Sequence, residues 1–298
     1  MSSERQESVK KATIFSLFST ILLAAAKWVA GLLGNSYALI ADAIESSIDI
    51  ISSFFVFLGL RYANKPADED HPYGHGRIEP IITFFIVGLM ILSANLIAYQ
   101  SIINIFTPHE APEIWTLIVV GIIILWKETS YQIILRKSKK LKSSTLRAEA
   151  WHHRSDAITS LAAFIGILLA VSLGKGYEFM DDIAALVASF FIAYNAYKIF
   201  RPAWGEIMDE NTYEDFKQEI INDAATLPEI LLVEKCHIRK VGIYFYIDMH
   251  IEVDGNMCVR RGHEISHDFK DLLMSKYSEI ADVLIHIEPA YEHKKQDV

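Results

Sequence analysis

The fold is decided by residues 38–60, ALIADAIESSIDIISSFFVFLGL. This stretch is long and apolar enough to cross a bilayer as a helix, yet its first half carries Asp42, Glu45 and Asp49. Their spacing of three and then four residues places the three carboxylates on one helical face. Charged groups on one stripe cannot face lipid, so we expect this face to line a polar path or to bind a cation.

A second apolar segment, residues 151–173, complements the first. It begins WHHRSD, which places His152 and Asp156 four residues apart at the start of the run. Packing the two helices together would bring Glu45, Asp49, His152 and Asp156 into one site with nitrogen and oxygen ligands. Such a four-ligand set is typical of a divalent transition metal, and two pairs spaced by four residues allow tetrahedral closure.

A purely structural alternative is that these acidic groups form ion pairs between helices. In the second to sixth apolar runs we expect no Lys or Arg deep in the membrane, apart from Lys127 and Arg154 near helix ends. The lack of deep basic partners favours metal or proton handling over ion pairs. Asp42, one turn outward from Glu45, either assists the site or simply lines the path. His153 points about 100° away from His152 and is expected to support the ligands or lie at an interface.

Apolar residues, 52% of the 298, concentrate before about residue 202. This unevenness predicts a membrane domain at 1–203 and a soluble domain at 204–298. The net charge of −9 argues against nucleic acid as a partner. The two cysteines, Cys236 and Cys258, imply no disulfide framework.

Six apolar runs are long enough to span a bilayer, which predicts a multi-pass protein of the cell (inner) membrane. Lys and Arg concentrate before the first run and in the loops after the second and fourth, so both termini are expected in the cytoplasm. Lys27, inside the first run, is expected to snorkel outward past Trp28, with a proton or ion role as the alternative. Asp181 and Asp182 open the sixth run and are expected to cap a helix start, or else to line an outer vestibule. The six runs are 12–34, 37–60, 80–103, 114–135, 147–173 and 179–200.

The soluble region predicts an α+β domain of order αββαβ, with two helices on a three-stranded sheet. In the second strand, Phe245 to Val253, apolar and polar residues alternate, so one face is expected in the core. A hairpin turn is expected near Gly242. The five elements are expected at 211–227, 229–242, 243–255, 256–280 and 281–289.

Two further groups of residues suit a metal. The loop KPADEDHPYGHGRIE, residues 65–79, holds Asp68, His71 and His75. By itself this spacing indicates a solvated loop, but in a protein that also has a membrane metal site it favours a second metal-binding site. Scattered histidines in a soluble domain usually have no ligand role, but here several elements contribute them. The expected cluster is His237, His250, His263, His286 and Glu288, with His267, Cys236 and Cys258 as less favoured additions.

These motifs together resemble the cation diffusion facilitator family of proton-coupled divalent-metal exporters. The matching features are ADAIESSID at 41–49, HHRSD at 152–156, PADEDHPYGHGRIE at 66–79 and the αββαβ tail ending LIHIEP. The resemblance covers nearly the whole chain. It implies a homodimer in the lipid bilayer, six spans per subunit, a ferredoxin-like cytoplasmic domain and exchange of cytoplasmic metal for protons.

Carried over by position, the resemblance implies a transport site, a loop site and a tail cluster at the three groups of residues described above. It also implies a salt bridge between Arg77 and Asp209 that locks the dimer. Glu45 departs from the family motif, which more often has Asp or His, and a longer carboxylate relaxes the preference for Zn²⁺ toward Fe²⁺ or Mn²⁺. Zn²⁺ is the expected substrate and regulatory ligand, with Fe²⁺, Mn²⁺ or Cd²⁺ as alternatives.

Two other functional classes compete with a metal/proton antiporter. A membrane metalloenzyme needs an open metal position, whereas four protein ligands leave none, and the sequence has no HExxH motif. A metal sensor without transport activity would signal through its tail. The paired intramembrane carboxylates favour a transport path over a sensor.

Overall fold

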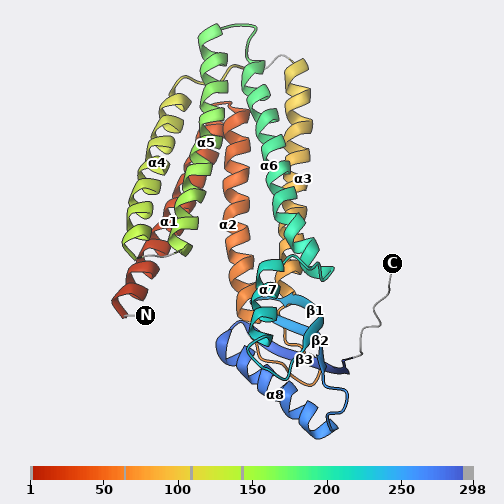
Figure 1. Ribbon diagram of the computed structural model, residues 1–298. Coiled ribbons are helices and arrows are strands. Elements are labelled where there is room, and N and C mark those ends of the chain that lie inside the picture. Colours follow the sequence, from red (N-terminus) through yellow and green to blue (C-terminus); the bar gives the residue numbers. More distant parts are fainter. Residues whose placement is uncertain (1–2, 64, 108–109, 142–143, 291–298) are drawn as a thin grey trace, which may run out of the picture. The chain divides into compact units, whose positions relative to one another are not determined.

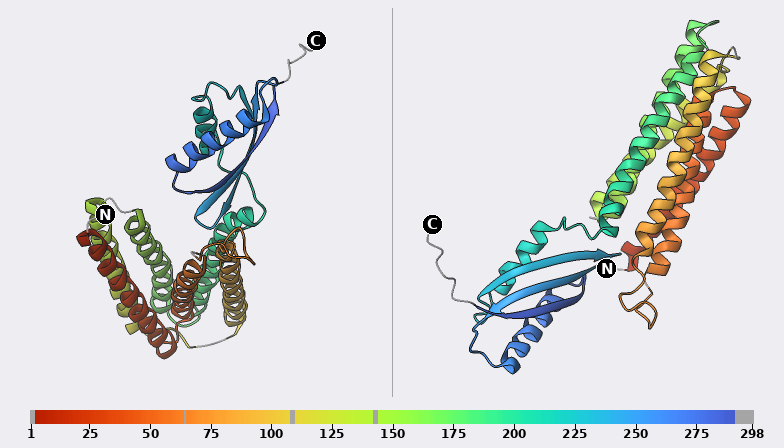
Figure 2. Two further views of the ribbon diagram at one scale, coloured as in Figure 1. Left: turned by 90° about the horizontal axis from the view of Figure 1, so that it is seen from below. Right: turned by 90° about the vertical axis from the view of Figure 1, so that its right-hand side faces the viewer.

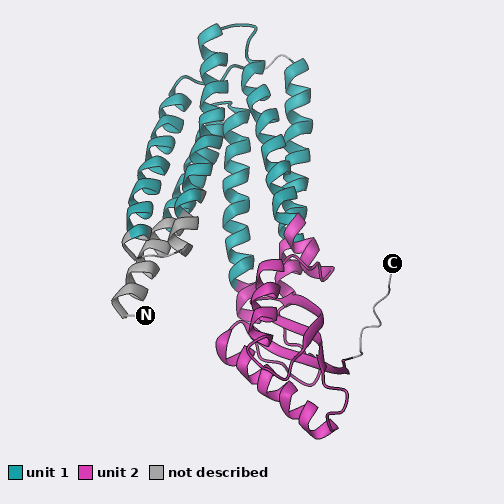
Figure 3. Ribbon diagram, in the orientation of Figure 1, with its two compact units in different colours: residues 1–57, 84–200 teal, residues 58–83, 201–298 magenta. Residues whose placement is uncertain are grey.

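A computed structural model of the protein describes residues 3–63, 65–107, 110–141 and 144–290 (Figure 1). Within the helices, the side chains at 3–17, 138, 140, 141, 144–149 and 152 lie outside this description. The chain divides into two compact units, residues 1–57 with 84–200 and residues 58–83 with 201–298 (Figure 3). The first unit is helical, and the second contains the sheet.

Six long helices account for the predicted spans, and five of them are long and apolar enough to cross a membrane. The described side chains of the first, Phe18–Leu33, form a shorter apolar segment. Large apolar side chains such as Phe190, Leu125 and Phe18 are more than two-thirds exposed, as a surface in contact with lipid requires. The chain is therefore a multi-pass membrane protein. Its helices are α1 (Ser3–Leu33), α2 (Tyr37–Ala63), α3 (Ile78–Phe106), α4 (Trp115–Leu141), α5 (Ser144–Leu173) and α6 (Phe179–Ile207).

Small residues allow the membrane helices to approach closely, because lipid supplies no hydrophobic drive for their association. A Cβ atom added to Gly166 of α5 would lie 2.3 Å from the Ala184 Cβ of α6. Several alanines of these helices are buried, including Ala163 and Ala170 of α5 and Ala185 of α6. Helices α4 and α5 pack along their length, with α1 beside them (Figure 2).

Asp181 connects the start of α6 to the start of α2. Its carboxylate accepts hydrogen bonds from the backbone N–H groups of Tyr37 (2.5 Å) and Ala38 (3.1 Å) and from the Ser36 hydroxyl (2.9 Å). It therefore satisfies N–H groups that the first turn of α2 leaves without intrahelical partners. Asp182 accepts a hydrogen bond from Asn104 of α3 (2.9 Å). The capping role expected from the sequence exists, but the helix that Asp181 caps is α2.

The predicted αββαβ order of the soluble region is confirmed. Strand β1 pairs with β2 in antiparallel fashion, β2 pairs with β3 in parallel, and the sheet order is β1-β2-β3. The hairpin turns at Gly242, whose φ of 64° favours glycine. The elements are α7 (Glu214–Ala224), β1 (Leu232–Val241), β2 (Tyr244–Val253), α8 (Val259–Lys276) and β3 (Ile280–Pro289).

The core of this domain lies on one face of the sheet. Ile247, Met249 and Ile251 of β2 are at most 1% exposed and pack in one cluster with Phe269 and Leu273 of α8. The alternate residues of β2 face away from this core, as the period of two requires. The opposite face is therefore polar and carries His250.

Candidate metal centres

The membrane site begins with the acidic face of α2. Asp42 is buried, and Glu45 and Asp49 are half-buried. The Glu45 carboxyl interacts electrostatically with Asp42, Asp49 and Asp156. Acidic groups of α2 and α5 are therefore close together inside the helical unit. The side chain of the fourth expected ligand, His152, lies outside the described residues.

Lys27 does not snorkel, so that prediction was wrong. Its side chain is fully buried, and its ammonium group donates to Asp42 Oδ1 (2.7 Å) and Ser46 Oγ (2.8 Å). A buried ammonium group is tolerated when a carboxylate and further hydrogen bonds compensate its lost hydration. The carboxylate of α2 provides that compensation, which the sequence of α1 alone does not reveal.

Asp42 joins three helices. Its Oδ1 accepts from Lys27 of α1, and its Oδ2 accepts from the Ser160 hydroxyl of α5 (2.8 Å). Both carboxylate oxygens are thus engaged by protein groups. Of the two roles left open by the sequence, this geometry favours Asp42 as a supporting residue that positions α2 against α1 and α5.

The expectation that no deep basic residue pairs with the acidic cluster was also wrong. Lys127 lies near the middle of α4 and is 3% exposed, and its ammonium group lies 3.0 Å from Asp156 Oδ2. Lys27, Asp42, Lys127 and Asp156 act on one another electrostatically. The longer extent of α4, to Leu141, moves Lys127 away from the helix end where it was expected. His153 is buried, at 1% exposure.

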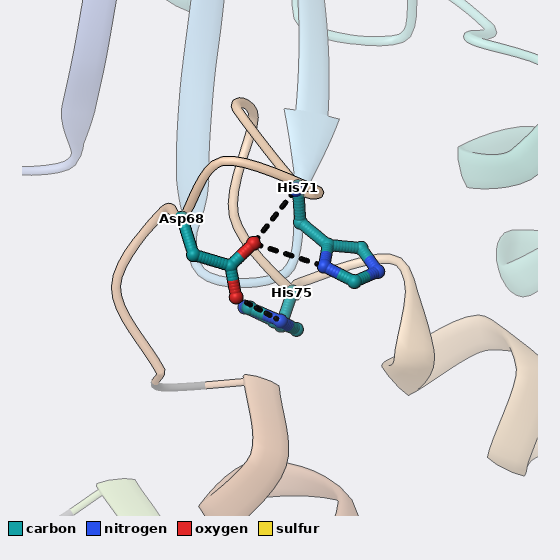
Figure 4. Close-up of side chains that lie close together, drawn as sticks. All are labelled: Asp68, His71 and His75. Carbon is teal, nitrogen blue, oxygen red and sulfur yellow. Dashed lines mark hydrogen bonds and ion pairs between the residues drawn. The ribbon is translucent and has the colours of Figure 1, made fainter.

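The second candidate centre is the loop between α2 and α3 (Figure 4). Asp68 Oδ1 lies 3.0 Å from His71 Nδ1, and Asp68 Oδ2 lies 3.4 Å from His75 Nε2. The two imidazole rings are 4.4 Å apart. One ligand atom from each residue falls within 4.8 Å of the others, so the three side chains could hold one metal ion.

The backbone of this loop pre-arranges the three ligands. The His71 N–H donates to Asp68 Oδ1 (2.7 Å), and Gly74 turns the chain with a φ of 76°. Desolvation raises the pKa of Asp68, but the hydrogen bonds from His71 outweigh it, so the pKa of Asp68 lies below its usual value. His75 is 7% exposed, and its Nδ1 has no hydrogen-bond partner among the described residues. The His75 atom that faces Asp68 is Nε2, so this unpartnered Nδ1 is not the nitrogen that faces the other two side chains.

The loop is held against the β1–β2 hairpin within the second compact unit. A Cβ atom on Gly76 would lie 2.7 Å from the carbonyl of Val241, so only glycine permits this approach. The Tyr246 hydroxyl donates to the Tyr73 carbonyl (3.1 Å), and the two rings meet edge to face. Gly76 of the HPYGHG motif permits this docking, but the strands that it contacts were not predictable from the motif.

The third candidate centre lies on the polar face of the sheet. The parallel register places His250 of β2 opposite His286 of β3. His250 Nδ1 lies 2.5 Å from Glu288 Oε1, and His286 Nε2 lies 3.9 Å from the same oxygen. The hydrogen bond with His250 lowers the pKa of Glu288 below its usual value. Glu234, which the sequence did not single out, lies 3.9 Å from His250 Nδ1.

The other two residues of the expected tail cluster do not join this group within one chain. The β1–β2 register places His237 opposite Asp248 and His250 opposite Lys235. His263 lies on α8 beside His267, with ring centroids 4.5 Å apart, and lines a cavity of about 350 Å³. Helix α8 packs on the apolar face of the sheet, whereas His250 lies on the polar face. The sheet therefore separates His263 from the other three.

Two family models together match most of the chain. One, described as the cation efflux transmembrane domain, matches residues 13–208. The other, described as the cytoplasmic domain of cation efflux proteins, matches residues 212–290. Their boundary falls between α6 and α7.

Individual relatives match over the full length. The manganese efflux system protein MneP of Bacillus subtilis is 29% identical over 297 residues, covering 98% of this chain and 100% of the relative. The manganese efflux system protein MneS of the same organism is 30% identical over 298 residues, covering 96% and 98%. Among solved structures, the metal-bound C-terminal domain of the CzcD transporter from Thermotoga maritima is 33% identical, covering 26% of this chain and 92% of that one, with a TM-score of 0.26.

Proposed function

The chain belongs to the cation diffusion facilitator family of metal cation efflux transporters, and from this we propose that it exports a divalent metal cation in exchange for protons. The observation that carries the proposal is the convergence of carboxylates from α2 and α5 inside a unit of membrane helices. Carboxylates are costly in that environment, and a cation passing through the membrane gives them a function.

The proposed transport site consists of Glu45, Asp49, His152 and Asp156. Three carboxylates and one imidazole supply oxygen and nitrogen ligands to a divalent ion. Asp42 is not part of this set, because Lys27 and Ser160 engage its two oxygens. The loop site and the sheet cluster are proposed as two further metal-binding places outside the membrane helices.

Two metals are candidates for the transported ion. Zn²⁺ suits a four-ligand site that contains an imidazole. Mn²⁺ suits a site dominated by carboxylates, and both Bacillus relatives described above are named for manganese efflux. Fe²⁺ and Cd²⁺ are further candidates for the same ligands. Measuring transport of each of these ions separately decides which of them the protein prefers.

Proton exchange follows from competition for the same ligands. A metal binds only when its carboxylates are ionised and its imidazole is neutral, so binding releases protons. When the site opens to the opposite side of the membrane, protons bind to these ligands and release the metal. We propose cytoplasmic termini in the cell (inner) membrane, as the distribution of Lys and Arg indicates, and a homodimer as the working unit.

The experiment that tests this proposal is metal-dependent proton flux in proteoliposomes, with Zn²⁺, Mn²⁺, Fe²⁺ and Cd²⁺ supplied separately. Wild type should exchange metal for protons, and Asp49→Ala should not. Glu128→Gln is a matched control, because Glu128 lies on α4 and bonds Gln132 (2.9 Å) outside the proposed site. Wild type that binds metal but moves neither metal nor protons would be a sensor, and the proposal would fail.

A further inference from the structure

Lys127 occupies a position that the transport mechanism described above does not use. It comes from α4, which supplies none of the proposed ligands, and its ammonium group lies 3.0 Å from Asp156 Oδ2. The Lys127 side chain is 4% exposed and that of Asp156 is 13% exposed. The pair is therefore largely withdrawn from water. In such a buried environment an ion pair is stronger, and its loss more costly, than at a surface.

Among the described side chains of the helical unit, the buried lysines Lys27 and Lys127 differ in their partners. Lys27 is held by Asp42 and Ser46, and Asp42 is not one of the proposed ligands. Lys127 is held by Asp156, which is one of them. The same carboxylate that a metal ion would take is thus already neutralised by a cation of the protein.

An ammonium group and a divalent cation compete electrostatically at one carboxylate. A metal bound to Asp156 within a few ångströms of Lys127 would experience repulsion between two positive charges in a medium of low dielectric constant. The carboxylate can exchange the lysine for the metal, because an ionised carboxylate accepts hydrogen bonds or metal bonds through either oxygen.

We propose that Lys127 is a built-in competitor of the transported metal: it holds Asp156 when the site is empty and is displaced from it when a metal binds. This inference rests on the proposed transport function. The displaced ammonium group stays near the site, where it weakens the hold on the metal and favours release. Lys127 is therefore a positioning residue that acts through Asp156. It lowers the affinity for the metal and raises the transport rate.

The test is a comparison of metal affinity and transport rate in the full-length protein. Lys127→Met removes the charge and retains a side chain of similar length. The dissociation constant for Mn²⁺ or Zn²⁺, measured by isothermal titration calorimetry, should fall by about tenfold, within the range typical of coupled sites. The maximal transport rate in proteoliposomes should fall as well, because release becomes slower. Lys127→Arg retains the charge and should keep an affinity near that of wild type.

Three comparisons separate this role from a merely structural one. Lys27→Met removes a buried lysine that is bonded to Asp42 and not to a proposed ligand, so it should tighten metal binding less than Lys127→Met does. In the Asp156→Asn background, Lys127→Met should tighten metal binding by less than it does in the wild-type background, because the ammonium group and the metal no longer compete for one carboxylate. Lys127→Gln replaces Lys127→Met if the latter does not fold. Unchanged or weaker metal binding in folded Lys127→Met or Lys127→Gln would overturn the inference, while transport by wild type would still support the proposed function.

Discussion

The Arg77 guanidinium lies 2.6 Å from the Asp209 carboxylate, and both residues belong to the second compact unit of one chain. The same guanidinium donates to the backbone carbonyl of Glu206 (2.8 Å), in the last turn of α6. A cation at the end of a helix satisfies carbonyls that have no partner within it. The predicted salt bridge therefore exists, and its role in locking a dimer remains a prediction.

Replacing Arg77 by Ala should clearly reduce the fraction of dimer while changing the free energy of unfolding only slightly. The pair is more than one-third exposed on both sides, so its loss should lower the free energy of unfolding by about 1 kcal/mol or less. Dimer fraction is measured by light scattering or cross-linking in detergent. Arg201→Ala, which removes an exposed pair with Glu210 (2.5 Å), is the matched control. A dimer fraction in Arg77→Ala equal to that of the control would count against the locking role.

The buried pair of Lys27 and Asp42 predicts a large effect on stability. Lys27→Met leaves a buried carboxylate without its counter-ion, which typically costs about 3–5 kcal/mol. The unfolding temperature in detergent should therefore fall clearly below that of wild type. Lys198→Met removes an exposed lysine from α6 and should change it little. Equal unfolding temperatures for the two variants would mean that the Lys27 pair is not stabilising.

The fold followed from the sequence because its signals are local. Apolar runs of bilayer length and a period of two in β2 identify the helices and the strand faces without any knowledge of their neighbours. The carboxylates of α2 were recognised for the same reason. Lys27 and Lys127 were misjudged because their environment is created by other helices: a lysine is expected to reach water unless a carboxylate from elsewhere faces it.

The tail cluster illustrates the same limit. His250, His286 and Glu288 could be grouped by reading strand faces, but the grouping with His237 and His263 required the register and the side on which α8 packs. A shift of one residue in register moves a side chain to the other face. Sequence composition alone could not show that His263 and His250 lie on opposite sides of the sheet within one chain.

The loop site predicts a change in metal stoichiometry. Replacing His75 by Ala removes a ligand whose ring is buried, and metal binding at the loop should be lost while the membrane site is retained. Metal content per chain, measured by mass spectrometry of the native protein, should fall by one equivalent. Asp70→Ala, an exposed acidic residue of the same loop, is the control. Equal metal content in the two variants would exclude the loop as a binding place.

The sheet cluster predicts a regulatory effect. His250→Ala combined with His286→Ala should alter how transport depends on cytoplasmic metal concentration without abolishing maximal transport, because the proposed membrane ligands are intact. His263→Ala should behave like wild type in this assay, since the sheet separates it from the cluster within one chain. Proteoliposome transport measured over a range of metal concentrations gives both quantities. Identical curves for the double variant and wild type would refute regulation by this cluster.

The two cysteines should react differently with a thiol reagent. Burial raises the pKa of the Cys236 thiol to about 11, and the side chain is 4% exposed, whereas Cys258 is exposed. The thiolate is the reactive form, and raising the pH toward 9 leaves Cys236 protonated because its pKa is still higher. Maleimide should therefore label one cysteine per native chain and two after denaturation. Cys258→Ser should abolish native labelling, and labelling of that variant at pH 9 would show that the domain opens or that Cys236 is less buried than the fold requires.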